Sequence, residues 1–148
     1  MKHKIIYNEQ GYYLKALYVL IIQVENTTSI KVGSLGELVF KTGIYAYVGS
    51  AQTNLDQRIK RHLRKEKKLF WHIDYLLNSD KTKIKKVIIK KGIKKEECNL
   101  ANLINRKGKA IPKFGSSDCN CKSHLFFIKN YGFLERNMKE KTKKHNTF

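Results

Sequence analysis

The longest apolar run in the chain, Ala16 to Val24, sets the tightest limit on its fold. It reads ALYVLIIQV and is rich in β-branched and aromatic residues, which favour a buried strand. The run is too short to cross a membrane, which takes about 18 consecutive apolar residues. Polar, turn-forming residues follow it at 25–28. The sequence therefore predicts a globular domain that contains this strand in its core.

The rest of the pattern predicts short antiparallel strands followed by helices. Leu55, Ile59 and Leu63 recur four apart, as on one face of a helix. We expect strands at 16–24, 29–32, 37–40, 44–48, 84–89 and 123–128, and helices from 54 onward, at 69–78 and at 96–106. The expected fold class is α+β, a small and mainly antiparallel sheet flanked by helices in a single domain. The domain is placed at 16–130, after a lead-in at 1–15 that can add an edge strand and before a basic, flexible tail at 131–148.

Positive charge is the dominant feature of the composition. Lys and Arg number 31 against 12 Asp and Glu, for a formal net charge of +19. Such a field attracts polyanions and speeds their encounter, so the expected partner is DNA or RNA. No long basic helix with an aromatic face favours a membrane surface. The competing explanation is compositional bias or a hot habitat, with no ligand involved.

The N-terminal residues lack the apolar block and cleavage site of a signal peptide. An intracellular, cytoplasmic location is therefore expected, nucleoid association included. The odd number of cysteines agrees with this expectation, because secreted domains pair theirs in disulfide frameworks.

The best candidate site begins where a strand ends in Tyr47-Val48-Gly49-Ser50-Ala51. Arg58 and His62 follow on a helix and, being four apart, share a face. Gly49 and Ser50 allow a backbone or a phosphate to come close. A phenol, a guanidinium and an imidazole can thus converge on one pocket, next to the basic helix residues Lys60, Arg61, Arg64 and Lys65. The alternative is a tight turn followed by a solvated basic helix.

The segment WHIDYLL, at 71–77, offers two further polar groups. His72 and Asp74 lie two apart on the expected helix and so point to different sides. We interpret the segment as core, formed by Trp71, Tyr75 and Leu76, with His72 at the edge of the site.

A strand ending in Tyr-Val-Gly, then Asn54-Leu55 and Arg58, resembles the second half of the signature of the GIY-YIG nucleases. The first half is assigned to Ala16-Leu17-Tyr18, with Gly11-Tyr12-Tyr13 as a second candidate. Gly43-Ile44-Tyr45 is treated as a decoy, because the two motifs occupy separate neighbouring strands in the family. Longer strings resemble a mostly archaeal subfamily of small GIY-YIG domain proteins, also found fused to endonuclease III-like glycosylases. They are VGSLGELVF, YAYVGSA, RIKRH, KKLFWHIDYLL, EECNLA and FGSSDCNCKSHLFF, spread over Ala16 to Ile128.

The resemblance implies a metal-dependent endonuclease that hydrolyses phosphodiester bonds, with DNA rather than RNA as substrate and a role in repair or recombination. It implies that Glu97 holds one divalent ion, Mg²⁺ or Mn²⁺, with Glu96 as second choice. Arg58 would pair with the phosphate, Tyr18 or Tyr47 would take a proton from the attacking water, and His62 would orient water or share that proton.

Two departures from the family pattern leave other functions open. Ala16 replaces a glycine, and no asparagine stands at the expected place in the loop after the glutamate helix, where Ser116 and Ser117 are found and Asn120 comes only later. The alternatives are a nucleic-acid-binding domain that retains the scaffold without catalysis, and a module that recruits DNA-repair proteins.

Four residues outside this pattern can ligate a metal. Cys98, Cys119, Cys121 and His124 offer three thiolates and an imidazole, the donor set of a closed tetrahedral zinc site. The spacing Cys-x-Cys-x-x-His is unlike a standard zinc knuckle, and Cys98 stands on another element. The sequence alone thus favours small buried thiols and a hydrogen-bonded histidine over structural Zn²⁺.

Overall fold

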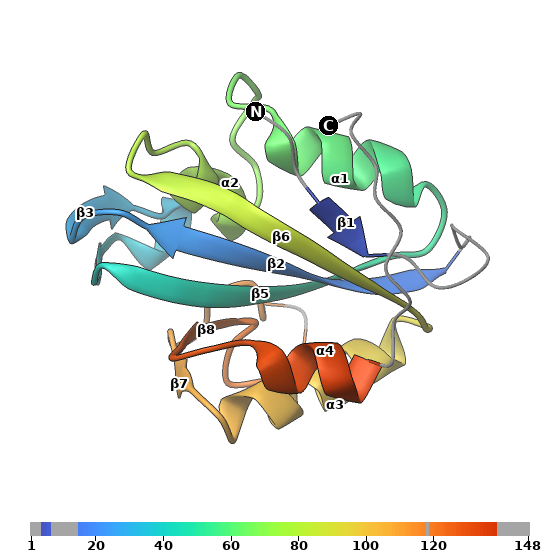
Figure 1. Ribbon diagram of the computed structural model, residues 1–148. Helices are drawn as coiled ribbons and strands as arrows, with labels where there is room; N and C mark the ends of the chain where they lie inside the picture. Colours follow the sequence, from blue (N-terminus) through green and yellow to red (C-terminus); the bar gives the residue numbers. More distant parts are fainter. Residues whose placement is uncertain (1–3, 7–14, 118, 139–148) are drawn as a thin grey trace.

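The computed structural model describes residues 4–6, 15–117 and 119–138. A sheet forms the middle layer, with α1 and α2 on one face and α3 and α4 on the other (Figure 1). The strands are β1 (Lys4–Ile6), β2 (Ala16–Val24), β3 (Thr28–Lys31), β4 (Glu37–Phe40), β5 (Gly43–Ala51), β6 (Thr82–Lys91), β7 (Lys109–Ala110) and β8 (Leu125–Ile128). The helices are α1 (Leu55–Leu63), α2 (His72–Leu77), α3 (Lys95–Asn105) and α4 (Gly132–Met138), and a 3-10 turn, η1 (Gly33–Leu35), joins β3 to β4.

The strand β2 lies in the middle of the main sheet. The sheet has the order β1-β6-β2-β5-β8-β7, while β3 and β4 form a separate hairpin. β2 pairs antiparallel with β5 on one side and with β6 on the other. β1 adds at the edge, parallel to β6, and the other pairings of the described strands are antiparallel. The predicted α+β domain with a mainly antiparallel sheet is confirmed.

Alternate side chains of β2 divide the core between the two faces of the sheet. One set packs with α1 and α2 and contains Tyr18, Leu20 and Ile22 with Ile59 and Ile73. The other set packs with α3 and α4 and contains Leu17, Val19 and Ile21 with Ile104 and Leu134. Because helices cover both faces, the strand can be apolar along its whole length.

The helix α1 starts at a well-defined cap that fixes where its functional face points. The Asn54 side chain accepts a hydrogen bond from the Gln57 amide, as an N-cap residue does. Leu55 and Ile59 are buried against the sheet, together with His62. Arg58 and His62 are thereby held on the side that faces β2 and β5.

The predicted end of the domain at residue 130 is wrong. α4 continues the fold to Met138, and its Phe133 and Leu134 are buried against the α3 side of the sheet. Two apolar residues next to a strongly basic segment are a weak sequence signal, which is why the tail was predicted to begin at 131. None of the helices in the described part of the chain is long and apolar enough to cross a membrane.

Candidate active site

A pocket of about 570 Å³ opens where β2, β5, α1 and α3 come together. Tyr18, Tyr47, Arg58 and Glu97 all line it, as do Gly49 and Ser50. Tyr18 and Tyr47 lie on neighbouring strands, since β2 pairs with β5. The structure therefore brings together the groups that the sequence pattern selected. The second candidate for the first motif, Gly11-Tyr12-Tyr13, lies outside the described residues.

The ring of Tyr18 crosses directly over Gly49. The two residues are partners in the β2–β5 register, and a Cβ at position 49 would lie 2.5 Å from both Cζ and Oη of Tyr18. Only glycine leaves this space open. The space over Gly49 is therefore occupied by the Tyr18 ring, which lies between the strand and the pocket.

The Tyr18 hydroxyl is buried and bonded to a histidine. Its Oη lies 2.7 Å from Nε2 of His62. Burial raises the pKa of Tyr18 to about 12, against the opposing effect of the Arg58 charge. Burial also lowers the pKa of His62 to about 3, and the charge of Lys67 adds to this effect. The imidazole is therefore neutral at pH 7, and its tautomer decides which of the two groups donates.

Tyr47 forms the neighbouring wall of the pocket and is half-buried. Burial raises the pKa of its hydroxyl well above the ordinary value, with the negative charge of Glu97 adding to the effect. Its ring packs edge-on against His62 and Phe114. Tyr45, on the same strand, donates its hydroxyl hydrogen to the Lys41 carbonyl instead and does not line the pocket. This agrees with the treatment of Gly43-Ile44-Tyr45 as a decoy.

Two contacts fix the guanidinium of Arg58 at the pocket. Its Nη1 donates to the carbonyl of Ser50 over 2.9 Å. Its Cζ lies 4.7 Å from the centre of the Trp71 ring, within the range of a cation–π contact. The positive group is held in place before any ligand arrives.

The carboxylate of Glu97 reaches the pocket from α3 and makes two contacts. Oε1 accepts a 2.6 Å hydrogen bond from the Ser50 hydroxyl, and Oε2 lies 2.7 Å from Nδ1 of His124. The Glu96 carboxylate makes a different contact: its Oε1 accepts a hydrogen bond from the Ile93 amide, just before α3. Of these two acidic neighbours, Glu97 alone lines the pocket.

The loop between β7 and β8 closes another side of the pocket, through Gly115 and Ser117. The Gly115 amide donates to Nδ1 of His72, which ties the loop to α2. His72 itself lines the pocket, as predicted for the edge of the site. Asn120, the asparagine nearest the expected place, is exposed and does not line the pocket.

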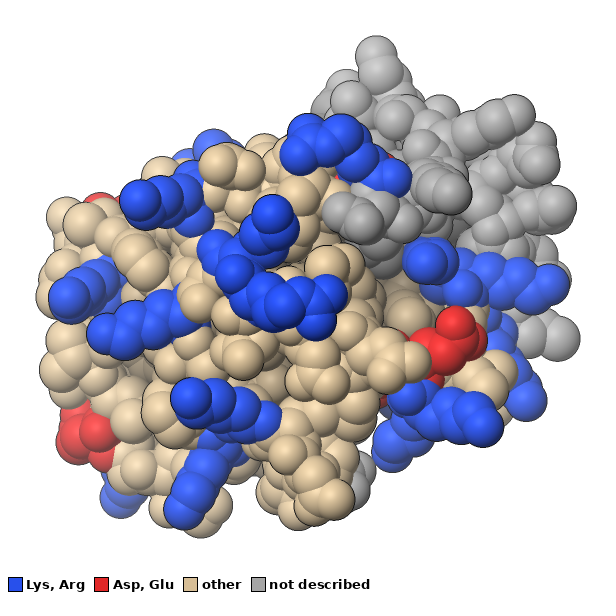
Figure 2. Space-filling model, turned by 90° about the horizontal axis from the view of Figure 1, so that it is seen from below, with Lys and Arg blue, Asp and Glu red and all other residues tan. Residues whose placement is uncertain are grey.

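The basic residues predicted to bind nucleic acid divide into two groups. Arg61 forms a bidentate pair with the buried Asp74, and Lys65 donates to the carbonyls of Leu77, Ser79 and Thr82. These two cations are paired within the protein, although Lys65 is itself exposed. Lys60, on α1, and Arg64, directly after it, are also exposed. On the face formed by α3 and α4, Figure 2 shows Lys and Arg spread widely and acidic groups confined to small areas.

Sequence reasoning missed two aromatic residues at the pocket. Trp71, predicted as core, lines the pocket and carries both Arg58 and Arg61 against its ring. Phe70 also lines the pocket, yet it is 72% exposed. The signal was an adjacent aromatic pair that follows a basic segment. Such a pair suits stacking on bases as well as burial in a core.

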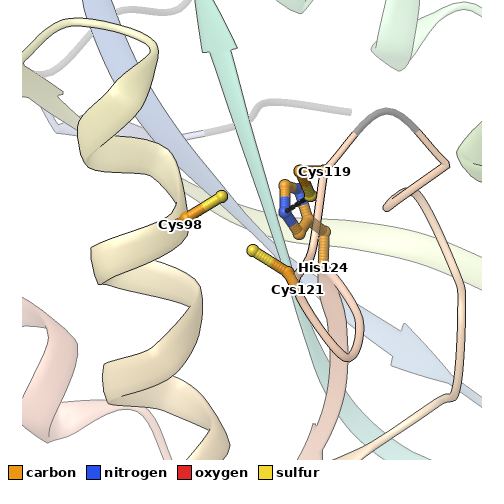
Figure 3. A group of neighbouring side chains, drawn as sticks. All are labelled: Cys98, Cys119, Cys121 and His124. Carbon is orange, nitrogen blue, oxygen red and sulfur yellow. Dashed lines mark hydrogen bonds between the residues drawn. The ribbon is translucent and has the colours of Figure 1, made fainter.

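The four predicted metal ligands gather on the other side of Glu97. Cys98 projects from α3, and Cys119, Cys121 and His124 project from the loop before β8 (Figure 3). One ligand atom from each lies within 4.8 Å of the others. Nε2 of His124 is 3.5 Å from Sγ of Cys119. The sequence favoured small buried thiols and a hydrogen-bonded histidine and did not predict this grouping, because the contact between α3 and the loop joins distant parts of the sequence.

Comparison with known proteins identifies one family. A family model described as a domain of unknown function, DUF123, matches residues 17–147. A search of curated proteins found no match. A search of solved structures found none either.

Proposed function

The chain belongs to the DUF123 family, and we propose that its pocket hydrolyses phosphodiester bonds in nucleic acid, as an endonuclease of the GIY-YIG type. The observation that carries the proposal is that Tyr18, Tyr47, Arg58 and Glu97 line one pocket although they come from four separate elements. A cation for the phosphate, phenols near the attacking water and a carboxylate for a metal ion form the minimal set for this reaction.

The surroundings of the pocket support a nucleic acid as the substrate. The net charge of +19 favours a polyanion over a neutral small molecule. Phe70, which is exposed and lies next to Trp71, lines the same pocket as Arg58, so that a base can stack on its ring near the bound phosphate. We propose DNA as the substrate, in repair or recombination.

Glu97 is the residue that would hold a divalent ion, Mg²⁺ or Mn²⁺. A carboxylate has about four lone-pair positions, so two remain beside the contacts to Ser50 and His124. One carboxylate completed by water ligands suits Mg²⁺, a hard cation that keeps much of its hydration. The donor set therefore fits the ion, which when bound would polarise the phosphate and stabilise the leaving oxygen.

The side chains of the chain itself supply binding and proton transfer. Arg58, already fixed by Ser50 and Trp71, binds a phosphate oxygen without having to reorganise. Tyr18 orients the attacking water and accepts its proton while passing its own to Nε2 of His62. A bound phosphate raises the pKa of His62, because its negative charge favours the imidazolium. Tyr47, on the adjacent wall of the pocket, donates a hydrogen bond to the bound substrate.

Two observations favour a second candidate function, nucleic-acid binding without cleavage. Both Glu97 oxygens already have partners, and burial holds the Tyr18 pKa at about 12. A pocket with these properties binds a phosphate even where it cannot activate water.

Cleavage of supercoiled plasmid and of branched DNA, with Mg²⁺ or Mn²⁺, separates the candidates. We expect cleavage by the parent protein and its loss in Glu97→Gln and Arg58→Ala. Matched controls are Glu37→Gln on the exposed hairpin and Arg106→Ala at the end of α3, which should cut normally. Binding without cleavage of any substrate would establish the binding domain. Weak binding at physiological salt would favour a module that recruits repair proteins.

A further inference from the structure

We propose that Cys98, Cys119, Cys121 and His124 hold one structural Zn²⁺ ion. Their ligand atoms lie within 4.8 Å of one another, and they point toward a common centre (Figure 3). Zn–S and Zn–N bonds of roughly 2.3 and 2.0 Å require S···N edges of roughly 3.5 Å in a tetrahedron. The contact from Cys119 Sγ to His124 Nε2 measures 3.5 Å. The geometry thus favours the metal site over the buried thiols and hydrogen-bonded histidine that the sequence favoured.

The second nitrogen of His124 supports the same assignment. A zinc-bound histidine almost always donates its other ring N–H to a carboxylate or a carbonyl, which fixes its tautomer and orientation. Nδ1 of His124 lies 2.7 Å from Oε2 of Glu97, and the histidine is almost fully buried. Nε2 is therefore the nitrogen directed at the thiols.

The ion would join two segments that lie far apart in the sequence. Cys98 lies on α3, whereas Cys119 and Cys121 belong to the loop that closes the pocket through Gly115 and Ser117. Cross-linking by zinc fixes this loop, and the loop in turn fixes one wall of the pocket.

The net charge of the proposed site is compatible with the positive charge of the chain. Binding releases the thiol protons, because thiolate and not thiol is the ligand. Three thiolates and Zn²⁺ then carry a net charge of −1, and the net charge of +19 elsewhere in the chain offsets it. The Nδ1 proton of His124 stays in place and is shared with Glu97.

The zinc site also positions Glu97, and this second part rests on the proposed function. Two adjacent residues of α3 belong to different sites: Glu97 lines the pocket, and Cys98 belongs to the cysteine–histidine cluster. His124 connects the two sites through its ring. Loss of the metal would release both the loop and the carboxylate.

The test uses the full chain purified without chelator, with metal measured by mass spectrometry and Co²⁺ substitution followed by visible absorption. We expect one Zn²⁺ per chain, tetrahedral Co²⁺–thiolate bands, and stoichiometric metal lost in Cys98→Ser and Cys121→Ser. The matched control is Asn120→Ala, an exposed residue between two of the cysteines, which should bind zinc fully. Glu97→Gln should weaken zinc affinity by about 10–100-fold.

Reactivity of the parent protein toward a thiol reagent covers the case in which a cysteine variant fails to fold. The thiols should be protected with zinc and reactive after chelation. No bound metal, no cobalt bands and equal thiol reactivity with and without zinc would overturn the proposal, as would a disulfide in the purified protein. Zinc binding without any DNA cleavage would leave the zinc site standing while the nuclease proposal fails. Cleavage by a protein with no affinity for zinc would do the reverse.

Discussion

Tyr18 and His62 share a buried hydrogen bond of 2.7 Å between the hydroxyl of the central strand and Nε2 of the helix that covers it. This bond joins the two residues that the proposed proton transfer requires. It also keeps two polar groups paired in a core that is otherwise apolar.

Removal of the Tyr18 hydroxyl tests the chemistry separately from binding. In Tyr18→Phe we expect DNA cleavage to fall by about 10²–10⁴-fold, the contribution of a positioned proton-transfer group, with DNA affinity unchanged. Tyr45→Phe is the matched control, because that hydroxyl bonds the Lys41 carbonyl away from the pocket. Single-turnover cleavage and a binding titration on both variants give the answer. Equal cleavage rates in the two would exclude Tyr18 from the reaction.

The neutral state of His62 predicts acid sensitivity of the fold. Its pKa is lowered from 6.5 to about 3, so the unfolded chain binds the proton first as the pH falls. The stabilisation is present above pH 6.5 and is lost between there and pH 3. Denaturant unfolding at several pH values should give a free energy that falls over this window, less steeply in His62→Gln. Asp74, whose pKa is also lowered, is present in both proteins and cancels in the comparison. Identical slopes would contradict the buried neutral histidine.

Gly49→Ala should destabilise the protein, because the new Cβ would lie 2.5 Å from the Tyr18 ring. We expect a loss of about 1–3 kcal/mol in the free energy of unfolding, the usual cost of overpacking. In a Tyr18→Ala background the same change should cost far less, since the ring is gone. Thermal and denaturant melts of the four proteins complete the double-mutant cycle. A full cost in both backgrounds would show that the strain has another source.

Phe70→Ala should weaken DNA binding while leaving stability unchanged. The side chain is 72% exposed and lines the pocket, and a stacked base contributes about 1–3 kcal/mol of binding free energy. Val39→Ala provides the control, as it removes a 67% exposed apolar side chain from β4. Fluorescence anisotropy with single-stranded DNA measures both. Indistinguishable affinities would rule out Phe70 as a stacking platform.

Two arginines of the same helix region should behave oppositely. Arg61→Ala leaves Asp74 buried without its bidentate partner and should cost about 1–3 kcal/mol of stability. Arg64→Ala changes an exposed position and should preserve stability. It should reduce the slope of log K for DNA binding against log salt concentration by the amount expected for about one phosphate contact. Chemical denaturation and binding at several salt concentrations distinguish the two. A stable Arg61→Ala protein would contradict the internal role.

Local pattern was enough to predict the elements on which the pocket is built. β2 and β4 were predicted with the bounds that the structure has, because apolar and β-branched residues end sharply at turn residues. Strand pairing then brought Tyr18 and Tyr47 to neighbouring positions. β5 and β6 extend beyond the predicted ranges, since pairing along the whole of β2 carries them past their apolar centres.

Partners across long sequence separations could not be predicted. Nothing local distinguishes Arg61, which pairs with the buried Asp74, from Arg64, which is exposed. The contact of Glu97 with His124 depends on how α3 meets a loop with little regular structure. Their adjacent positions on one helix place Cys98 close to Glu97 already in the sequence. That either lies near Cys119 is known only from the folded structure.

The position of β2 between β5 and β6 has a consequence for synthesis on the ribosome. β2 is made well before its partner β6, which ends only at Lys91. Until β6 has been made, one edge of β2 is unpaired and much of its two apolar faces is exposed to water. Long-range strand pairing of this kind is slow and prone to aggregation. The growing polypeptide should therefore depend on chaperones until β6 has left the exit tunnel.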